Sequence, residues 1–304
     1  MATTVTAPVA NSMALAQKYV PLLDAVYKRE SLTGMFDAQR VDWTGVDTVK
    51  VYKLEALGLG NYSRNAGFVP GSLTGTWETF QISQDRARSF MLDYLDNEES
   101  MSVPIANALN EIERVHLIPE IDSYRFAKWA GTANIDGATK TIGAGDNVKD
   151  LIAAAEASMD DNEVPYEGRV LFVNPTIYQK LKGEIDRRII NSENNVNENV
   201  EYFDDMRIVR VPSARFNTAI TLATPADEDD AGGYTQSGVA INFAIIHPSA
   251  LFNVVKHYVP RVFTPAQNQE ADAWLIQPRI AHDTFVFANK VKGIYVHKAA
   301  VSSS

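Results

Sequence analysis

Two stretches with alternating apolar and polar residues stand on either side of a glycine-rich segment in the first third of the chain. Residues 48–54 (TVKVYKL) and 76–83 (TWETFQIS) follow the period of two that is typical of a β-strand. The segment 58–75 between them contains five glycines. The pattern predicts a long hairpin with a loose end. Because a two-stranded hairpin is marginal in water, we expect this one to lie on another surface.

The longest helical pattern runs from Met101 to Ala130. Pro104 suits the first turn of a helix, and Gly131 follows the last apolar residue of the pattern. Pro119 lies inside the pattern and is expected to kink the helix. About 30 helical residues would span about 45 Å, so this helix is the expected spine of the fold.

The rest of the chain contains both helical and strand patterns. A short amphipathic helix is expected at Tyr19–Ser31, and a charged connector at Gln84–Ser100. Further along we expect a loop at 131–146, a helix at 148–159, a strand at 169–173, a helix at 175–185 capped by Asn174, a polar loop at 191–199, and strands at 206–211, 219–222, 243–246, 254–262 and within 283–297.

Composition excludes several classes of protein. The 304 residues include no cysteine, so disulfides, thiolate metal sites and cysteine nucleophiles are excluded. The N-terminus lacks the pattern of a secretory signal, and no run of 18 apolar residues occurs, so we expect a soluble, non-secreted protein without a membrane partner. Asp and Glu exceed Lys and Arg by 38 to 28. Nucleic-acid binding without sequence preference needs clustered cations, so this chain is not expected to grip DNA.

Candidate catalytic and ligand motifs fail one by one. The glycine-rich segment has Ser63 where a dinucleotide fingerprint needs its third glycine, and a strand rather than a helix follows it. Asp227 and Asp229 match two positions of a calcium loop, but Ala231 and Gly238 occupy two others. The five histidines lie far apart, and no G-x-S-x-G elbow is present. We therefore predict no catalytic residue, no cofactor and no metal site.

The order of these parts resembles the major capsid proteins of tailed phages, and the resemblance implies an α+β fold, the Hong Kong 97-type shell fold. The likeness extends from about Met13 to Ala299. It is carried by several short motifs: Asp85-Arg86, Ser89-Phe90, Asp93, Asp96, Ile118-Pro119-Glu120-Ile121-Asp122, Leu171-Phe172-Val173-Asn174-Pro175, Val211-Pro212-Ser213, Asp283-Thr284-Phe285-Val286-Phe287 and Lys292-Gly293-Ile294-Tyr295-Val296.

The resemblance implies a division of the chain and a role for the hairpin. The parts would be an N-terminal arm at 1–45, an extended hairpin loop at 46–84, a peripheral domain with the spine helix at 85–188, an axial domain at 189–245, and return strands at 246–304. The hairpin tip would lie across a neighbouring subunit, and its glycines would let it adapt to that surface. The expected contact residues are Leu59, Tyr62, Arg64, Phe68 and Val69.

The resemblance also implies hexamers and pentamers of one chain in an icosahedral head that encloses double-stranded DNA without sequence-specific binding. The protein would be part of the virion capsid, after assembly in the cytoplasm of a host bacterium. Portal and decoration proteins are implied partners. Because the hairpin begins near Thr48, we expect a separate scaffolding protein or none, and no large N-terminal processing.

Three other interpretations remain open at this point. A bacterial nanocompartment shell protein of the encapsulin type would share the fold but enclose enzymes. An α/β enzyme is supported only by the helix–strand–helix unit, and a phage tail-tube subunit would not need the long helix. Within the shell family, some relatives join a lysine of the loop to a neighbour. The tip at 59–74 has Arg64 and no lysine, although Lys50 and Lys53 precede it, so we expect no covalent linkage.

Overall fold

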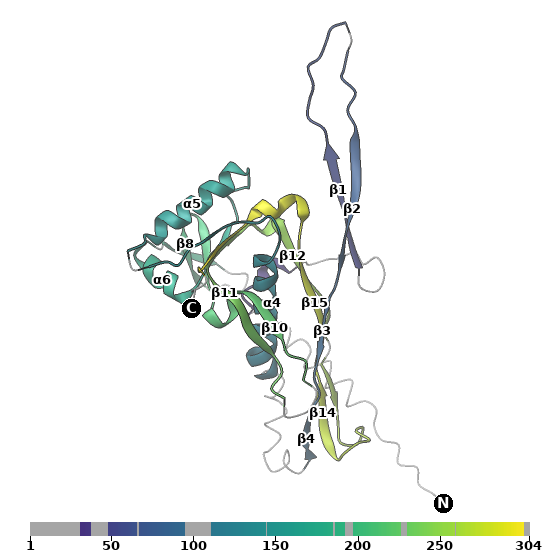
Figure 1. Cartoon of the computed structure of the whole chain (residues 1–304). Coiled ribbons are helices and arrows are strands. Elements are labelled where there is room, and N and C mark those ends of the chain that lie inside the picture. Colours follow the sequence, from purple (N-terminus) through teal and green to yellow (C-terminus); the bar gives the residue numbers. More distant parts are fainter. Residues whose placement is uncertain are drawn as a thin grey trace, which may run out of the picture.

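A long two-stranded hairpin projects from the body of the molecule (Figure 1). The structure is a computed structural model, and it describes residues 31–37, 48–94 and 111–300, apart from 66, 144, 185, 192–196, 226–229 and 259. Strands β1 (Thr48–Ala56) and β2 (Leu73–Gln81) pair antiparallel along their whole length. The predicted hairpin is therefore confirmed. The helix expected at Tyr19–Ser31 lies almost wholly outside the described residues.

The long helix expected after the hairpin in the sequence is described over residues 111–130. A π-helical turn at Glu113–Leu117 continues into α4 (Ile118–Ala130), and the Gly131 N–H bonds the Ala127 carbonyl where the helix ends. The helix continues through Pro119, the position of the expected kink, and its conformation changes from π to α just before this residue. Pro119 has no N–H to donate, and the preceding turn is widened so that the Ile118 N–H bonds the carbonyl five residues earlier. The expected first third, residues 101–110, lies outside the described residues.

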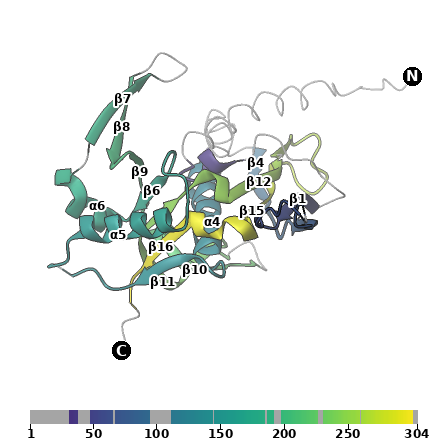
Figure 2. The same cartoon turned by 90° about the horizontal axis from the view of Figure 1, so that it is seen from above.

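An eight-stranded sheet forms the centre of the body, in the order β5-β16-β11-β6-β9-β8-β7, with β10 paired to β11. Figure 2 shows the β7–β8 hairpin projecting from one end. The strands are β5 (Asp136–Thr139), β6 (Val170–Val173), β7 (Asp186–Asn191), β8 (Asn197–Phe203), β9 (Met206–Arg210), β10 (Asn217–Leu222), β11 (Tyr234–Ile246) and β16 (Ile294–Lys298).

Helices cover both faces of this sheet, which explains its apolar strands. Phe126 and Trp129 of α4 pack against Phe172 on one face. Helices α5 (Val148–Asp161) and α6 (Pro175–Leu181) cover the other face, where Leu171 points. All four residues of β6 are buried as a result, as its unbroken apolar sequence predicted.

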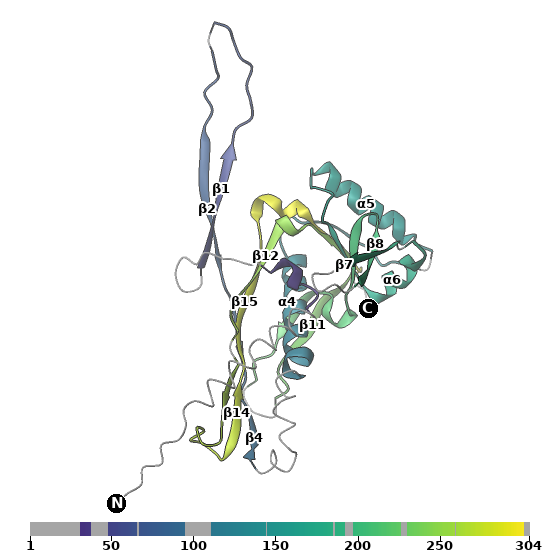
Figure 3. The same cartoon turned by 180° about the vertical axis from the view of Figure 1, so that it is seen from behind.

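Two three-stranded sheets continue the line of the hairpin into the body (Figure 3). Their orders are β12-β15-β3 and β13-β14-β4. The strands are β3 (Gln84–Ala87), β4 (Phe90–Asp93), β12 (Leu251–Tyr258), β13 (Arg261–Phe263), β14 (Ala273–Gln277) and β15 (Arg279–Val286). Short 3₁₀ segments lie at Gly34–Phe36, Lys182–Glu184, Ser213–Arg215, Pro248–Ala250 and Ala288–Gly293.

Several predicted loops prove to be strands. The connector expected at 84–100 contains β3 and β4, and the loop expected at 131–146 contains β5. The ends of β7 and β8 fall inside the polar loop expected at 191–199. Strands β3, β4 and β5 gain their hydrogen-bond partners from distant parts of the chain: β3, for example, pairs with β15. Local sequence patterns do not contain that information.

Candidate assembly interface

The hairpin tip presents apolar side chains to solvent in the single chain. Leu59, Tyr62, Arg64, Phe68 and Val69 are all exposed, and Phe68 retains 88% of its accessible surface. The rings of Tyr62 and Phe68 contact each other, with centroids 5.1 Å apart. The structure thus brings the predicted contact residues together at one end of the hairpin, away from the core.

A tight turn holds this tip in shape. The backbones of Ser63 and Gly67 exchange two hydrogen bonds, of 3.2 and 2.7 Å. Gly67 has a φ of 77°, in the region that favours glycine. The turn brings Tyr62 and Phe68, which flank it, to the same place.

A second apolar surface runs along the stem and was not predicted. Tyr52 pairs with Trp77, and Leu54 lies two residues further on, so all three side chains share one face of the two-stranded sheet. All three are exposed, and Trp77 retains 63% of its accessible surface. We call Tyr52, Leu54, Leu73 and Trp77 the stem face. The period-two pattern of the sequence includes Tyr52, Leu54 and Trp77, but only the strand register shows that Tyr52 and Trp77 are neighbours.

Packing within the stem face accounts for one glycine of the hairpin. The Tyr52 and Trp77 rings have centroids 5.0 Å apart. The Tyr52 ring lies over Gly75, where an added Cβ would be 1.7 Å from the Tyr52 Oη. A side chain at position 75 would therefore displace the tyrosine.

The base of the hairpin packs against the body through an aromatic cluster. The Phe80 ring centroid lies 4.9 Å from that of Phe285 and 5.4 Å from that of Phe252. Glu78 accepts a hydrogen bond of 3.2 Å from the Ala288 N–H. The hairpin is thus held at its base, while its tip and stem face remain open.

A buried carboxylate fastens residues 31–37 to α4. Asp122 is fully buried and accepts hydrogen bonds from the Thr33 hydroxyl at 2.6 Å and from the Leu32 N–H at 3.1 Å. The fully buried Arg125, one turn along α4, donates to the same hydroxyl at 2.8 Å and pairs with Asp37 at 2.9 Å. Residues 31–37 are therefore held beside α4.

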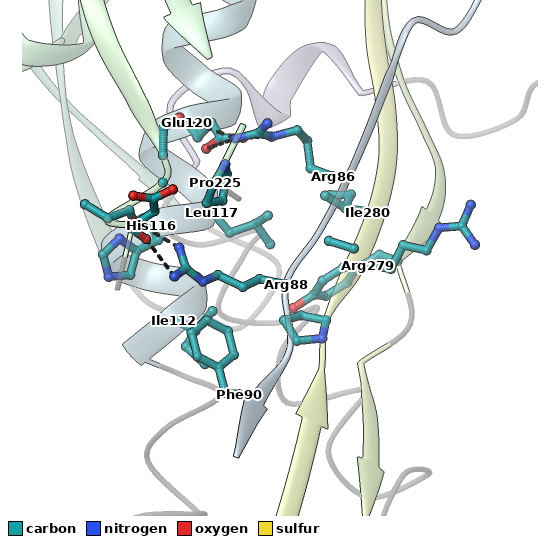
Figure 4. Close-up of a pocket in the computed structure, with 17 residues that line it drawn as sticks. Arg86, Arg88, Phe90, Ile112, His116, Leu117, Glu120, Pro225, Arg279 and Ile280 are labelled. Atoms are coloured by element: carbon teal, nitrogen blue, oxygen red, sulfur yellow. Dashed lines mark hydrogen bonds and ion pairs between the residues drawn. The ribbon is translucent and has the colours of Figure 1, made fainter. Parts of the chain in front are cut away.

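A cavity of about 370 Å³ lies between β3, the helix and the 230–233 loop (Figure 4). Arg86 donates to Glu120 at 2.7 Å, and Arg88 donates to the Asp230 carbonyl at 2.7 Å. Arg279 points away from the cavity and pairs with Asp85 (Figure 4). Arg86 and Arg88 thus connect β3 to α4 and to the 230–233 loop, and their role is structural.

The described histidines are held in separate environments. Burial lowers the pKa of His282 to about 3, with the charge of Arg125 adding to the effect, so this side chain is neutral at physiological pH. His247 contacts Ser249 and the Glu167 carbonyl, and burial lowers its pKa. Across the described part of the chain, no three His, Cys, Asp or Glu side chains are grouped so as to hold a metal ion. Asp227 and Asp229 lie outside that part.

No helix in the described ranges has the length and apolar character needed to cross a membrane.

Known protein families and curated proteins give no match to this sequence. Solved structures do. A capsid structure of the cyanophage P-SCSP1u is 15% identical, with a TM-score of 0.57, and the match covers 90% of this chain and 88% of that chain. The mature capsid of bacteriophage PhiM1 is 11% identical, with a TM-score of 0.53 and coverages of 84% and 83%.

A third similar structure is a virus-like particle from Pyrococcus furiosus. It is 14% identical, with a TM-score of 0.52, and the match covers 96% of this chain and all of that chain. The chain therefore has the α+β fold found in phage capsid structures and in this particle, as the sequence resemblance predicted.

Proposed function

We propose that this chain is the major capsid protein of a tailed phage, a structural subunit that assembles with copies of itself into an icosahedral shell around double-stranded DNA. The observation that carries the proposal is the hairpin, which exposes Tyr62, Phe68 and the stem face far from the body. Such a hairpin gains little from its own chain, because two strands alone are marginal in water. A neighbouring copy would supply the missing contacts.

The tip would meet the neighbour through its five contact residues. Leu59, Tyr62, Phe68 and Val69 would bury apolar surface, and Arg64 would face carboxylates of a chain whose net charge is −10. The proposed parts of the chain are the arm at 1–45, the extended loop at 46–84, the peripheral domain at 85–188, the axial domain at 189–245 and the return strands at 246–304. In this division α4 belongs to the spine of the peripheral domain.

The excess of acidic residues fits the enclosure of DNA. A shell must hold DNA at high density without binding its phosphates tightly, and a chain with 38 acidic and 28 basic residues provides few sites for phosphate contacts. We propose that the protein has a structural, non-enzymatic role in the virion, after assembly in a host bacterial cytoplasm. Hexamers and pentamers of the chain would form the head, with portal and decoration proteins as partners.

A nanocompartment shell is the second candidate, because the particle from Pyrococcus furiosus has a similar fold. The two functions differ in what the shell encloses. Expression of the chain, purification of particles and electron microscopy would test assembly, and the ratio of absorbance at 260 and 280 nm in particles from infected cells would test for nucleic acid. The proposal expects closed shells that contain DNA. Shells filled with protein would favour the nanocompartment, and a monomer under all conditions would refute both.

A further inference from the structure

Where β2 ends, the described chain joins the hairpin to the body through two residues. β2 pairs with β1 and ends at Gln81, whereas β3 begins at Gln84 and pairs with β15. Ile82 and Ser83 belong to neither strand. A few residues at the end of an element can absorb a large change in backbone angles, so the tilt of the hairpin can change where these two residues pass from one sheet to the other.

A buried carboxylate of β15 receives this junction. Asp283 is fully buried, and its Oδ2 accepts hydrogen bonds of 2.9 Å from both the backbone N–H and the hydroxyl of Ser83. Its Oδ1 accepts from the Tyr124 hydroxyl at 3.0 Å and from the Thr284 N–H at 2.7 Å, and it also pairs with Lys128. Both oxygens of the carboxylate are thus occupied, one by the junction and the other largely by α4.

The two helix residues are well placed to hold the carboxylate in one orientation. Tyr124 and Lys128 lie one turn apart on α4, and the Tyr124 hydroxyl also lies 3.2 Å from the Ser83 hydroxyl. Burial raises the pKa of Tyr124, so the phenol keeps the proton that it shares in this cluster. Hydrogen bonds to an ionised group are shorter and stronger than bonds between neutral groups, and several of them on one carboxylate restrict its orientation. The cluster therefore fixes angles as well as distances.

The neighbouring aromatic contacts have a different effect. Phe80 packs against Phe252 and Phe285, which holds the base of the hairpin to the body through apolar burial. Apolar burial is non-directional and tolerates some sliding and rotation. The aromatic cluster and the hydrogen bond from the Ala288 N–H to Glu78 thus attach the base of the hairpin, and the carboxylate cluster adds the contacts at the junction itself.

We propose that Ser83, Tyr124, Lys128 and Asp283 form a hinge clamp that fixes the tilt of the hairpin on the body. Given the proposed function, the clamp decides where the tip meets the neighbouring copy, and these four residues are positioning residues for assembly. The clamp itself is a property of the single chain, so it can be tested in dissociated subunits.

The absence of cysteine makes a direct test available. Asn61→Cys at the tip and Ala153→Cys on the exposed side of α5 would carry the only two spin labels in the chain. Double electron–electron resonance on dissociated subunits measures the distribution of distances between them. We expect a narrow distribution for the labelled parent protein. Combining Ser83→Ala with Tyr124→Phe should make the distribution roughly twofold wider, because the hinge residues lose their side-chain restraint.

Matched controls separate the clamp from general loss of structure. Asp85→Asn removes an exposed ion pair with Arg279 next to the junction, and it should leave the distribution unchanged. Circular dichroism of the Ser83→Ala, Tyr124→Phe protein should show native helix content, since both substitutions remove only a hydroxyl. If that protein loses its fold, Tyr124→Phe alone takes its place and should still widen the distribution.

Two results would overturn the clamp: a broad distribution in the parent protein, or an equally narrow one after the clamp substitutions. The proposed function fails separately, because it requires particles and the distance measurement does not. A widened distribution in a chain that never assembles would support the clamp and refute the shell. If the chain forms particles and the clamp substitutions leave its distance distribution unchanged, the shell is supported and the clamp is refuted.

Discussion

Truncation of Phe68 should weaken assembly and leave the subunit intact. Phe68 retains 88% of its accessible surface in the single chain, so Phe68→Ala removes almost no contact that stabilises the folded subunit. Surface substitutions of this kind change the free energy of unfolding by about 0.5 kcal/mol or less. If a neighbouring copy covers the ring, each contact loses about 2 kcal/mol of apolar burial. That corresponds to an affinity roughly 30-fold lower at each contact.

Two measurements on the same variant check this pair of expectations. Light scattering against protein concentration gives the concentration at which shells form, which should rise strongly for Phe68→Ala and little for Lys53→Ala. Urea unfolding of dissociated subunits should give the same free energy for Phe68→Ala as for the parent protein. Phe80→Ala is the matched control, because its ring packs in the basal aromatic cluster and its loss should destabilise the subunit itself. Assembly of Phe68→Ala at the parent concentration would refute the reasoning.

Three further predictions concern the body and the particle. Asp122→Asn should lower the free energy of unfolding by about 3 kcal/mol in urea titrations, because it replaces the buried carboxylate that accepts hydrogen bonds from Thr33. A loss below about 0.5 kcal/mol would show that this carboxylate does not anchor residues 31–37. Burial raises the pKa of Glu156 from 4.5 to about 7, and the charge of Asp204 adds to the effect. Ionised Glu156 therefore lowers the free energy of unfolding above about pH 7, and this destabilisation disappears as the pH falls toward 4.5. Glu156→Gln should therefore raise the unfolding free energy by about 1 kcal/mol at about pH 8, after screening by solvent, and by almost nothing at about pH 4; an equal effect at both pH values would show another cause. Boiled particles should give a single band near 33.6 kDa in detergent gels, and a ladder of multimers that Lys53→Ala abolishes would show a covalent linkage.

Elements with strong local signals could be predicted from the sequence. The hairpin, α5, β6 and α6 all appear where their patterns placed them, and Asn174 caps α6 by accepting from the Thr176 N–H at 2.8 Å. In each case the pattern and the end signal lie within one short stretch. The resemblance to capsid proteins depended on the order of such elements, and the similar solved structures agree with it.

Two of the missed elements, β3 and β5, depend on contacts between distant residues. Strand β3 exists because Asp85 pairs with Ala281, almost 200 positions later, and its own four residues are mostly polar. Strand β5 similarly pairs with β16 from the far end of the chain. A polar stretch that forms an edge strand looks like a loop until its partner is known.

The residues of the candidate interface also fall into those that the sequence could predict and those that it could not. The apolar residues of the tip could be predicted because they interrupt a glycine-rich segment. The stem face could not, because it requires the register that places Tyr52 beside Trp77. The hinge clamp could not either, because Ser83 and Asp283 are 200 positions apart.

A cryo-electron microscopy reconstruction of the assembled protein would show directly what the hairpin contacts. We predict a closed shell in which Phe68 and Tyr62 of each copy are buried against the body of a different copy. A shell in which the tip projects into solvent, or folds back onto its own chain, would contradict it.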